Sequence, residues 1–232
     1  MNEAGLEQKY VKEAFDTNWV VPMGPNVNAF EHDLEAFANS KNDGTEPLDR
    51  KVVCLSAGTA AVHLGLLASG VGPSDEVCVQ SFTFCASSHP ITYLGATPMF
   101  IDSEPDSWNM DTELLEKAII DRKEKTGKYP KAIVPVALYG MPYDCDKIMA
   151  ISEKYGIPVV EDAAEGCGSR WKGQVLGTFG KFGVLSFNGN KMITTSGGGA
   201  LICQDAESKN NVMWYATQAR DAYPYYQHTA IG

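Results

Sequence analysis

Long apolar runs are missing from the sequence, in which the apolar stretches reach only the length of a β-strand. A membrane-spanning helix needs about 20 consecutive apolar residues, so none is expected here. The N-terminal sequence MNEAGLEQKY also lacks the basic, apolar and small-residue segments of a secretory signal. These absences predict a cytoplasmic protein that is not bound to a membrane.

Cysteine pairs with redox or metal-binding spacing are missing as well. The six cysteines include no CxxC pair and no spacing typical of a metal site. Three of them, Cys54, Cys78 and Cys203, lie inside apolar, strand-like runs. We therefore expect reduced thiols packed in the protein interior, and no metal centre.

Positive charge is scarce, because 19 Lys and Arg residues stand against 29 Asp and Glu residues and give a formal net charge of −10. This balance argues against nucleic acid or an anionic membrane as the main partner. The sequence also contains no GxGxxG and no P-loop motif. The sequence therefore gives no motif that would indicate a nicotinamide or nucleoside-triphosphate site.

Strand-like and helix-like segments alternate along most of the 232 residues, a length sufficient for one large α/β domain. This alternation predicts a largely parallel sheet covered by helices on both faces, a three-layer α/β/α architecture. Asn28 is expected to follow a loop at 22–28 and to cap the second helix. The expected strands are 52–55, 77–80, 97–101, 132–137, 157–160 and 182–187, and the expected helices are 6–15, 28–38, 60–69, 111–125 and 146–155.

Polar side chains gather at the ends of two expected strands. Glu161 and Asp162 follow the first of these strands, and Ser186 and Asn188 lie at the end of the second. Ligands of open α/β sheets bind at this edge. Lys191 comes next, among small polar residues and followed by three consecutive glycines. The residues around it show no apolar periodicity of a helix or strand. This pattern predicts a lysine close to a ligand, the alternative being a solvated surface lysine.

The turn SAGTA at residues 56–60 lies between an expected strand and an expected helix. The N–H groups and the dipole of such a helix start attract anions. Gly58 permits close approach of the backbone, and Ser56 or Thr59 can donate a hydroxyl hydrogen bond. The alternative is an ordinary helix cap.

Five stretches, in chain order, resemble one protein family. They are TNWVVPMGPNVNAFE, SAGTAAVHLGL, QSFTFCAS, VPVALYGMPYD and the run from EDAAEGCGS to GTFGKFGVLSFNGNKMITTSGGGAL. They resemble the DegT/DnrJ/EryC1/StrS sugar aminotransferases, which are pyridoxal phosphate enzymes of fold type I. The most specific element is Ser186-Phe187 followed by Lys191, with Asp162 upstream.

The resemblance implies the large domain of that fold, with a mostly parallel but mixed sheet. Residues 1–50 would be an N-terminal segment that contributes to the substrate site and to packing, and residues 51–232 would be the domain that binds pyridoxal phosphate. The small C-terminal domain of the family is expected to be absent. We therefore expect this chain by itself to fold, to bind the cofactor weakly if at all, and to have little activity.

Pyridoxal phosphate needs an amine, an acid at its ring nitrogen, a phosphate cradle and a cover for its ring. The resemblance implies that Lys191 supplies the amine and later moves a proton, and that Asp162 holds the ring nitrogen. Ser186 would bind the phosphate together with the backbone of Gly58 and Thr59.

The resemblance also implies that Phe84 stacks on the ring, whereas Phe82 is expected in the core. Glu165 would lie near the ring oxygen, on the same side as the acid if a helical turn follows it. Glu161 is expected to point the other way, and Asn188 would be a supporting contact.

The implied reaction transfers an amino group from glutamate to a nucleotide-linked 4-keto-6-deoxy sugar, in a homodimer. The sequence around Lys191 most resembles that of enzymes that make sugars of the UDP-4-amino-4,6-dideoxy-N-acetylhexosamine or perosamine type. One alternative is a regulatory module that binds pyridoxal phosphate without turnover. Another is a related sugar dehydratase, against which Lys191 argues because those relatives usually have histidine there. A vestigial site is the third, and the complete set of Asp162, Ser186 and Lys191 argues against it.

Overall fold

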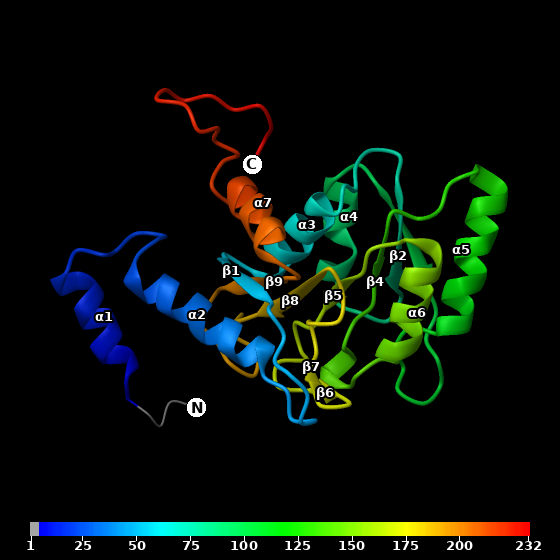
Figure 1. Cartoon of the computed structure of the whole chain (residues 1–232), viewed down its shortest axis with the longest axis horizontal. Helices are drawn as coiled ribbons and strands as arrows, with labels where there is room; N and C mark the ends of the chain where they lie inside the picture. Colours follow the sequence, from blue (N-terminus) through cyan, green and yellow to red (C-terminus); the bar gives the residue numbers. More distant parts are fainter. Residues whose placement is uncertain (1–4) are drawn as a thin grey trace.

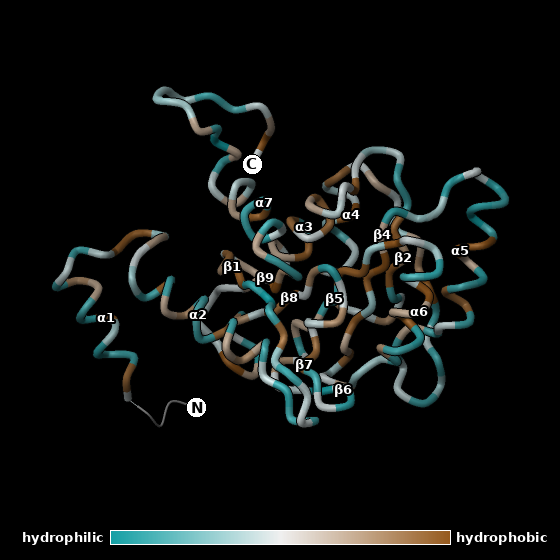
Figure 2. Tube along the Cα trace, viewed as in Figure 1, coloured by the Kyte–Doolittle hydropathy of each residue, from teal (hydrophilic) through white to brown (hydrophobic). Residues whose placement is uncertain are grey.

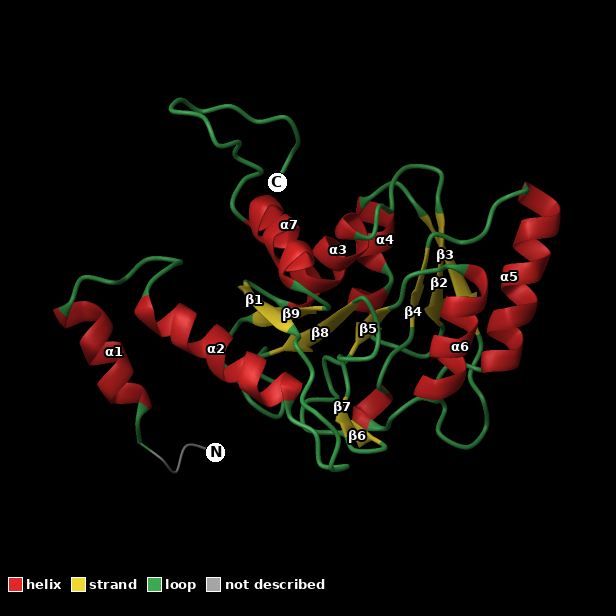
Figure 3. Cartoon of the chain, in the orientation of Figure 1, coloured by secondary structure: helices red, strands yellow, loops and turns green. Residues whose placement is uncertain are grey.

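A central sheet lies between two layers of helices in the computed structural model, which describes residues 5–232 (Figures 1 and 3). Residues 1–4 of the expected N-terminal segment lie outside the described residues. The helices are α1 (Glu7–Asp16), α2 (Pro25–Asn39), α3 (Gly58–Ala68), α4 (His89–Tyr93), α5 (Thr112–Thr126), α6 (Cys145–Tyr155) and α7 (Ala206–Ala216), with 3-10 turns at Cys85–Ser87 and Leu138–Gly140.

Two groups of strands make up the sheet. The first has the order β3 (Thr97–Ile101), β2 (Glu76–Gln80), β4 (Ala132–Val134), and the second has the order β5 (Val160–Asp162), β8 (Phe182–Ser186), β9 (Gly199–Cys203), β1 (Lys51–Leu55). Parallel bridges from β4 and Val136 to Val159 and Asp162 join the groups. The strand pairings are parallel except those of β9 with β8 and β1. This arrangement confirms the expected mostly parallel, mixed sheet.

Each face of the sheet has its own apolar core. One core combines buried side chains of α2, α5 and α6 with the sheet, for example Leu34, Leu115 and Ile148. The other combines the sheet with α3, α4 and α7, through Leu66 and Val212 among others. Figure 2 shows the hydrophobic trace concentrated along the central strands. The three-layer architecture therefore follows from burial on both faces of the strands.

Residues 5–232 contain no helix with the length and apolar character needed to cross a bilayer. A hairpin of β6 (Arg170–Trp171) and β7 (Gln174–Val175) lies outside the main sheet.

Several expected element boundaries were wrong, and two of them concern predicted residue roles. Helix α2 begins at Pro25 after Gly24, so Asn28 lies inside the helix and does not cap it. A proline at the first helical position has the φ angle that a helix requires, and its missing N–H costs nothing there. Strand β5 extends to Asp162, so the acidic pair belongs to the strand end and does not follow it.

Glu161 points away from Asp162, as expected from the alternation of side chains along a strand. Its buried carboxylate accepts hydrogen bonds from the hydroxyl of Tyr143 at 2.5 Å and from the backbone N–H groups of Gly177, Phe179 and Gly180 at 3.0, 2.6 and 2.6 Å. Burial raises the pKa of Glu161, and these four donors oppose that rise. The carboxylate thereby fixes the loop that leads into β8.

Glu161→Ala is expected to lower the free energy of unfolding by more than about 3 kcal/mol, because several buried donors would lose their acceptor at about 1–3 kcal/mol each. Urea unfolding would measure the loss. Glu46→Ala, in an exposed loop, is the matched control and should leave the midpoint unchanged. An unchanged midpoint in Glu161→Ala would contradict the assigned role.

Candidate functional site

A cavity of about 470 Å³ lies at the C-terminal edge of β5 and β8. Its walls come from the turn before α3, the loop after β2, the segment after β4, and the loops that follow β5 and β8. Every residue predicted for the cofactor site lines this cavity: Gly58, Thr59, Phe84, Asp162, Glu165, Ser186, Asn188 and Lys191. The fold thus brings together segments separated by more than a hundred residues.

Lys191 lies in the loop after β8, and its side chain is only 15% exposed. The Nζ atom is 3.4 Å from Oε1 of Glu165. The backbone N–H of Lys191 donates to the carbonyl of Asn188, whose side chain donates in turn to Asn190. Lys191 is therefore held inside the cavity wall, which excludes the alternative of a solvated surface lysine.

Asp162 ends β5 with a side chain that is 5% exposed. Its Oδ2 accepts a hydrogen bond from Oγ of Ser87 at 2.6 Å, and its Oδ1 accepts one from the N–H of Ala164 at 3.1 Å. Burial raises the pKa of Asp162, whereas the two donors and the nearby charge of Lys191 lower it. The carboxylate is thus fixed in orientation within the cavity.

Ser87 was missed by the sequence analysis. It lies 75 residues from Asp162, and a serine in a short 3-10 turn gives no local signal of such a contact. Oγ of Ser87 also lies 2.7 Å from Oγ1 of Thr83, which faces the cavity. Because Ser87 donates its one hydroxyl proton to Asp162, Thr83 must donate to Ser87. Because both hydrogen bonds run toward Asp162, they favour the ionised form of its carboxyl group.

Ser87→Ala is expected to raise the pKa of Asp162 further, because one of the two donors to the ionised carboxylate is lost. The carboxyl ¹³C shift of Asp162, followed against pH in the cofactor-free chain, measures this change. Ser87→Thr keeps a hydroxyl and should restore the original titration. Ser88→Ala is the neighbouring control, because Ser88 donates to the carbonyl of Cys85. Identical titrations for Ser87→Ala and the unaltered chain would show that the contact has no electrostatic effect.

The start of α3 approaches Ser186 closely. Helix α3 begins at Gly58 after an extended Ala57, and no side chain of residues 5–232 caps it. A Cβ atom at Gly58 would lie 2.9 Å from Cβ of Ser186 and 3.2 Å from its Oγ. Glycine is therefore required here, and the first N–H groups of the helix stay available beside a serine hydroxyl. This combination fits an anion and not the alternative of a side-chain cap.

Two phenylalanines reach the cavity. Phe84 lines it and is 73% exposed, and Phe82 also lines it and is 45% exposed. The prediction that Phe82 belongs to the core was wrong. Strand β2 ends at Gln80, so the chain has already left the sheet, and the ring of Phe82 packs against Trp108 with centroids 5.7 Å apart.

Glu165 reaches the cavity through an irregular bend, so it does not depend on the helical turn that would have placed it on the same side as Asp162. Its Oε2 accepts a hydrogen bond from the backbone N–H of Tyr139 at 2.8 Å, while Oε1 faces Lys191. Tyr139 has a left-handed φ of 49° and is followed by Gly140 at 83°. Glu165 thereby connects the segment after β4 with the lysine, a link that the sequence did not predict.

Comparison with known proteins agrees with this geometry. The sequence model of the DegT/DnrJ/EryC1/StrS aminotransferase family matches residues 2–232. The chain belongs to this family. Members of the family depend on pyridoxal phosphate.

Individual members of the DegT/DnrJ/EryC1/StrS family match over nearly all of the chain. EpsN of Bacillus subtilis is 46% identical over 99% of this chain and 56% of EpsN. A GDP-perosamine synthase of Escherichia coli O157:H7 is 36% identical over 98% of this chain and 58% of the synthase. The crystal structure of a family aminotransferase from Brucella abortus superposes with a TM-score of 0.84 at 30% identity, over 98% of this chain and 61% of that one. The chain therefore spans less than two thirds of the length of these relatives, and its fold is that of their family.

Proposed function

We propose that the chain provides the cofactor site of an aminotransferase that uses pyridoxal phosphate to move an amino group from glutamate to a nucleotide-linked 4-keto-6-deoxy sugar. The observation that carries this proposal is the placement of Lys191 in one cavity with Asp162, Ser186 and the start of α3. The 36% identity to a GDP-perosamine synthase supports the nucleotide-sugar class of substrate.

The cavity residues fit the cofactor part by part. Pyridoxal phosphate, when bound, supplies an aldehyde that takes up amines and a ring that accepts electrons. Lys191 would hold the aldehyde end and Asp162 the ring nitrogen. Ser186 would hold the phosphate together with the N–H groups of Gly58 and Thr59, in a space that a Cβ at position 58 would fill.

Proton handling follows from the contacts of the two central residues. Lys191 must lose a proton before Nζ can act as a nucleophile, and Oε1 of Glu165 at 3.4 Å is placed to accept it. Neutral Nζ can then take the proton from the α-carbon of glutamate. Asp162 faces the cavity as an anion held by two donors, so it would keep a cationic ring nitrogen protonated.

A homodimer in the cytoplasm is part of this proposal. Figure 1 shows α1 projecting away from the sheet and its helices. The end of α1 and the turn after it expose large apolar side chains, among them Phe15, Trp19 and Val20. Apolar patches of this kind mark interaction surfaces, and a second subunit would cover this one. The N-terminal segment up to residue 50 would then serve packing and the substrate site.

Borohydride reduction after incubation with pyridoxal phosphate, followed by peptide mass mapping, tests the assignment of the lysine. We expect the pyridoxyl mass on the peptide that contains Lys191. Lys172, which pairs with Asp146 on the surface, and Lys147, which pairs with Asp144 on the surface, are internal controls. A modification found only on these two lysines would reject the proposed site. Glutamate and candidate keto-sugars, followed by absorbance, then test the substrate class.

A further inference from the structure

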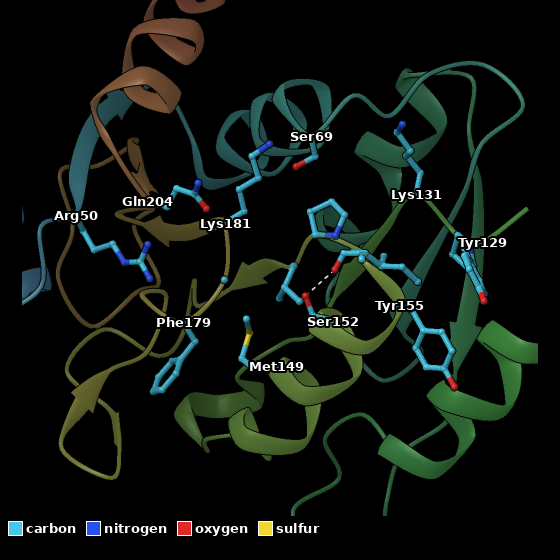
Figure 4. A pocket seen from close by; sticks show the side chains of 16 residues that line it. Arg50, Ser69, Tyr129, Lys131, Met149, Ser152, Tyr155, Phe179, Lys181 and Gln204 are labelled. Carbon is cyan, nitrogen blue, oxygen red and sulfur yellow. Dashed lines mark hydrogen bonds between the residues drawn. The ribbon is translucent and has the colours of Figure 1, made fainter.

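A second cleft, of about 670 Å³, lies at the opposite edge of the sheet (Figure 4). Lys131 and Lys181, which immediately precede β4 and β8, line it, as does Arg50, which immediately precedes β1. Strand β8 separates this cleft from the cofactor cavity, and its five residues extend roughly 16 Å. The cleft is thus a separate site at the other end of the same strands.

The charges of this cleft are of one sign. The described residues that line it include Arg50, Lys131 and Lys181 but neither Asp nor Glu, although the chain as a whole carries a net charge of −10. Throughout residues 5–232, these three cations form no ion pair. The carboxylates of Glu161 and Asp205 act on Arg50 from outside ion-pair distance, and Asp205 also acts on Lys181. The lining itself still carries only positive charge, which favours an anion.

Arg50 is the most constrained of the three cations. One of its Nη groups donates to the carbonyl of Thr178 at 2.5 Å, whereas its Nε is buried and has no partner among the described residues. The nearby carboxylates are already engaged. Glu161 binds backbone amides and a tyrosine, and Asp205 accepts from the N–H of Ser208 at the start of α7. Because Nε is closed to solvent, a phosphate in the cleft would contact the Nη groups of Arg50, and a planar guanidinium suits a phosphate.

The wall of the cleft opposite Arg50 carries two tyrosines, with Lys131 beside them. The rings of Tyr129 and Tyr155 lie 5.5 Å apart, and the hydroxyl of Tyr155 is bound to Glu116. Figure 4 shows Arg50 and Phe179 on one side of the cleft and the two tyrosines on the other. An aromatic or apolar group can pack on these rings while a phosphate faces the cations.

We propose that this cleft binds a phosphorylated small molecule with an aromatic or apolar body. Arg50, Lys131 and Lys181 supply the positive charge for the phosphate, and Tyr129 and Tyr155 supply the surface for the body. The proposal is independent of the proposed aminotransferase function, since it uses none of the residues of the cofactor cavity.

Phenyl phosphate is the probe, titrated into the ¹⁵N-labelled chain and followed by amide chemical shifts. We expect shifts at Gly156, Gly180 and Lys181, with weaker binding of inorganic phosphate, which lacks the ring. Shifts confined to Gly58 and Thr59 would place the probe in the cofactor cavity alone and overturn the proposal. Equal affinity for both probes would overturn the part assigned to the tyrosines.

Charge-removal variants complete the test. The double variant Lys131→Gln/Lys181→Gln is expected to weaken phenyl phosphate binding by about tenfold or more, because two charged partners are lost. Lys9→Gln/Lys12→Gln removes the same charge from α1 and should bind as the unaltered chain does. Equal affinities of the two double variants would show that attraction by the net charge, and not this cleft, accounts for binding.

Discussion

Lys191→Met is expected to abolish covalent capture of pyridoxal phosphate and to lower amino transfer by at least about a thousandfold. Methionine keeps most of the side-chain volume but has no amine. The amine is expected to serve both as nucleophile and as proton carrier, and proton transfer by a positioned side chain alone contributes about 10²–10⁴-fold. Single-turnover absorbance with glutamate measures the loss.

Stability should hardly change in this variant, because Lys191 has one ion pair within residues 5–232, at 3.4 Å, and lies in a loop. Lys172→Met is the matched control, since it removes a lysine whose ion pair with Asp146 is on the surface. We expect unaltered amino transfer in the control. Turnover of Lys191→Met within tenfold of the unaltered enzyme would mean that another group is the amine, and the proposed function would lose its central residue.

The gathering of Asp162, Ser186 and Lys191 could be predicted from sequence because parallel strands end at one edge of a sheet. Polar residues directly after apolar runs must meet there, whatever the details of the loops. The position of Gly58 could be predicted for a related reason, since a small-residue turn that joins a strand to a helix points its N–H groups to that edge.

Contacts that depend on the path of irregular segments could not be predicted. The hydrogen bonds from Ser87 to Asp162 and from Tyr139 to Glu165 start in short 3-10 turns, which no apolar periodicity in the sequence indicates. Phe82 was misplaced because alternation along a strand has no meaning after the strand has ended at Gln80. The eight residues predicted for the site do line the cavity, but Phe82 was not among them, and the structure was needed to show what orients them.

Asp162→Asn is expected to lower amino transfer by about a hundredfold or more, the usual loss when one strong electrostatic contact to the transition state is removed. Asparagine has nearly the same shape, and its oxygen can still accept from the N–H of Ala164. Its amide can donate to Ser87, whose proton then turns to Thr83. Asp162→Ala would instead leave these donors unpaired. A loss of activity in that variant could then come from lost stability as well as from the lost cofactor contact.

Stability of the cofactor-free chain should change in the opposite direction from activity. Burial raises the pKa of Asp162 above the usual 3.8, so between that value and the raised pKa the folded chain binds more protons than the unfolded chain. The unfolding free energy therefore falls as pH rises through this window, and asparagine has no such fall. We expect Asp162→Asn to gain stability relative to the unaltered chain as pH rises from 3.8 to neutral, which urea unfolding at several pH values measures. If the difference in stability does not depend on pH, burial does not destabilise the ionised form of Asp162. If Asp162→Asn loses activity but shows no pH-dependent gain in stability, the loss of activity comes from the missing contact with the cofactor alone.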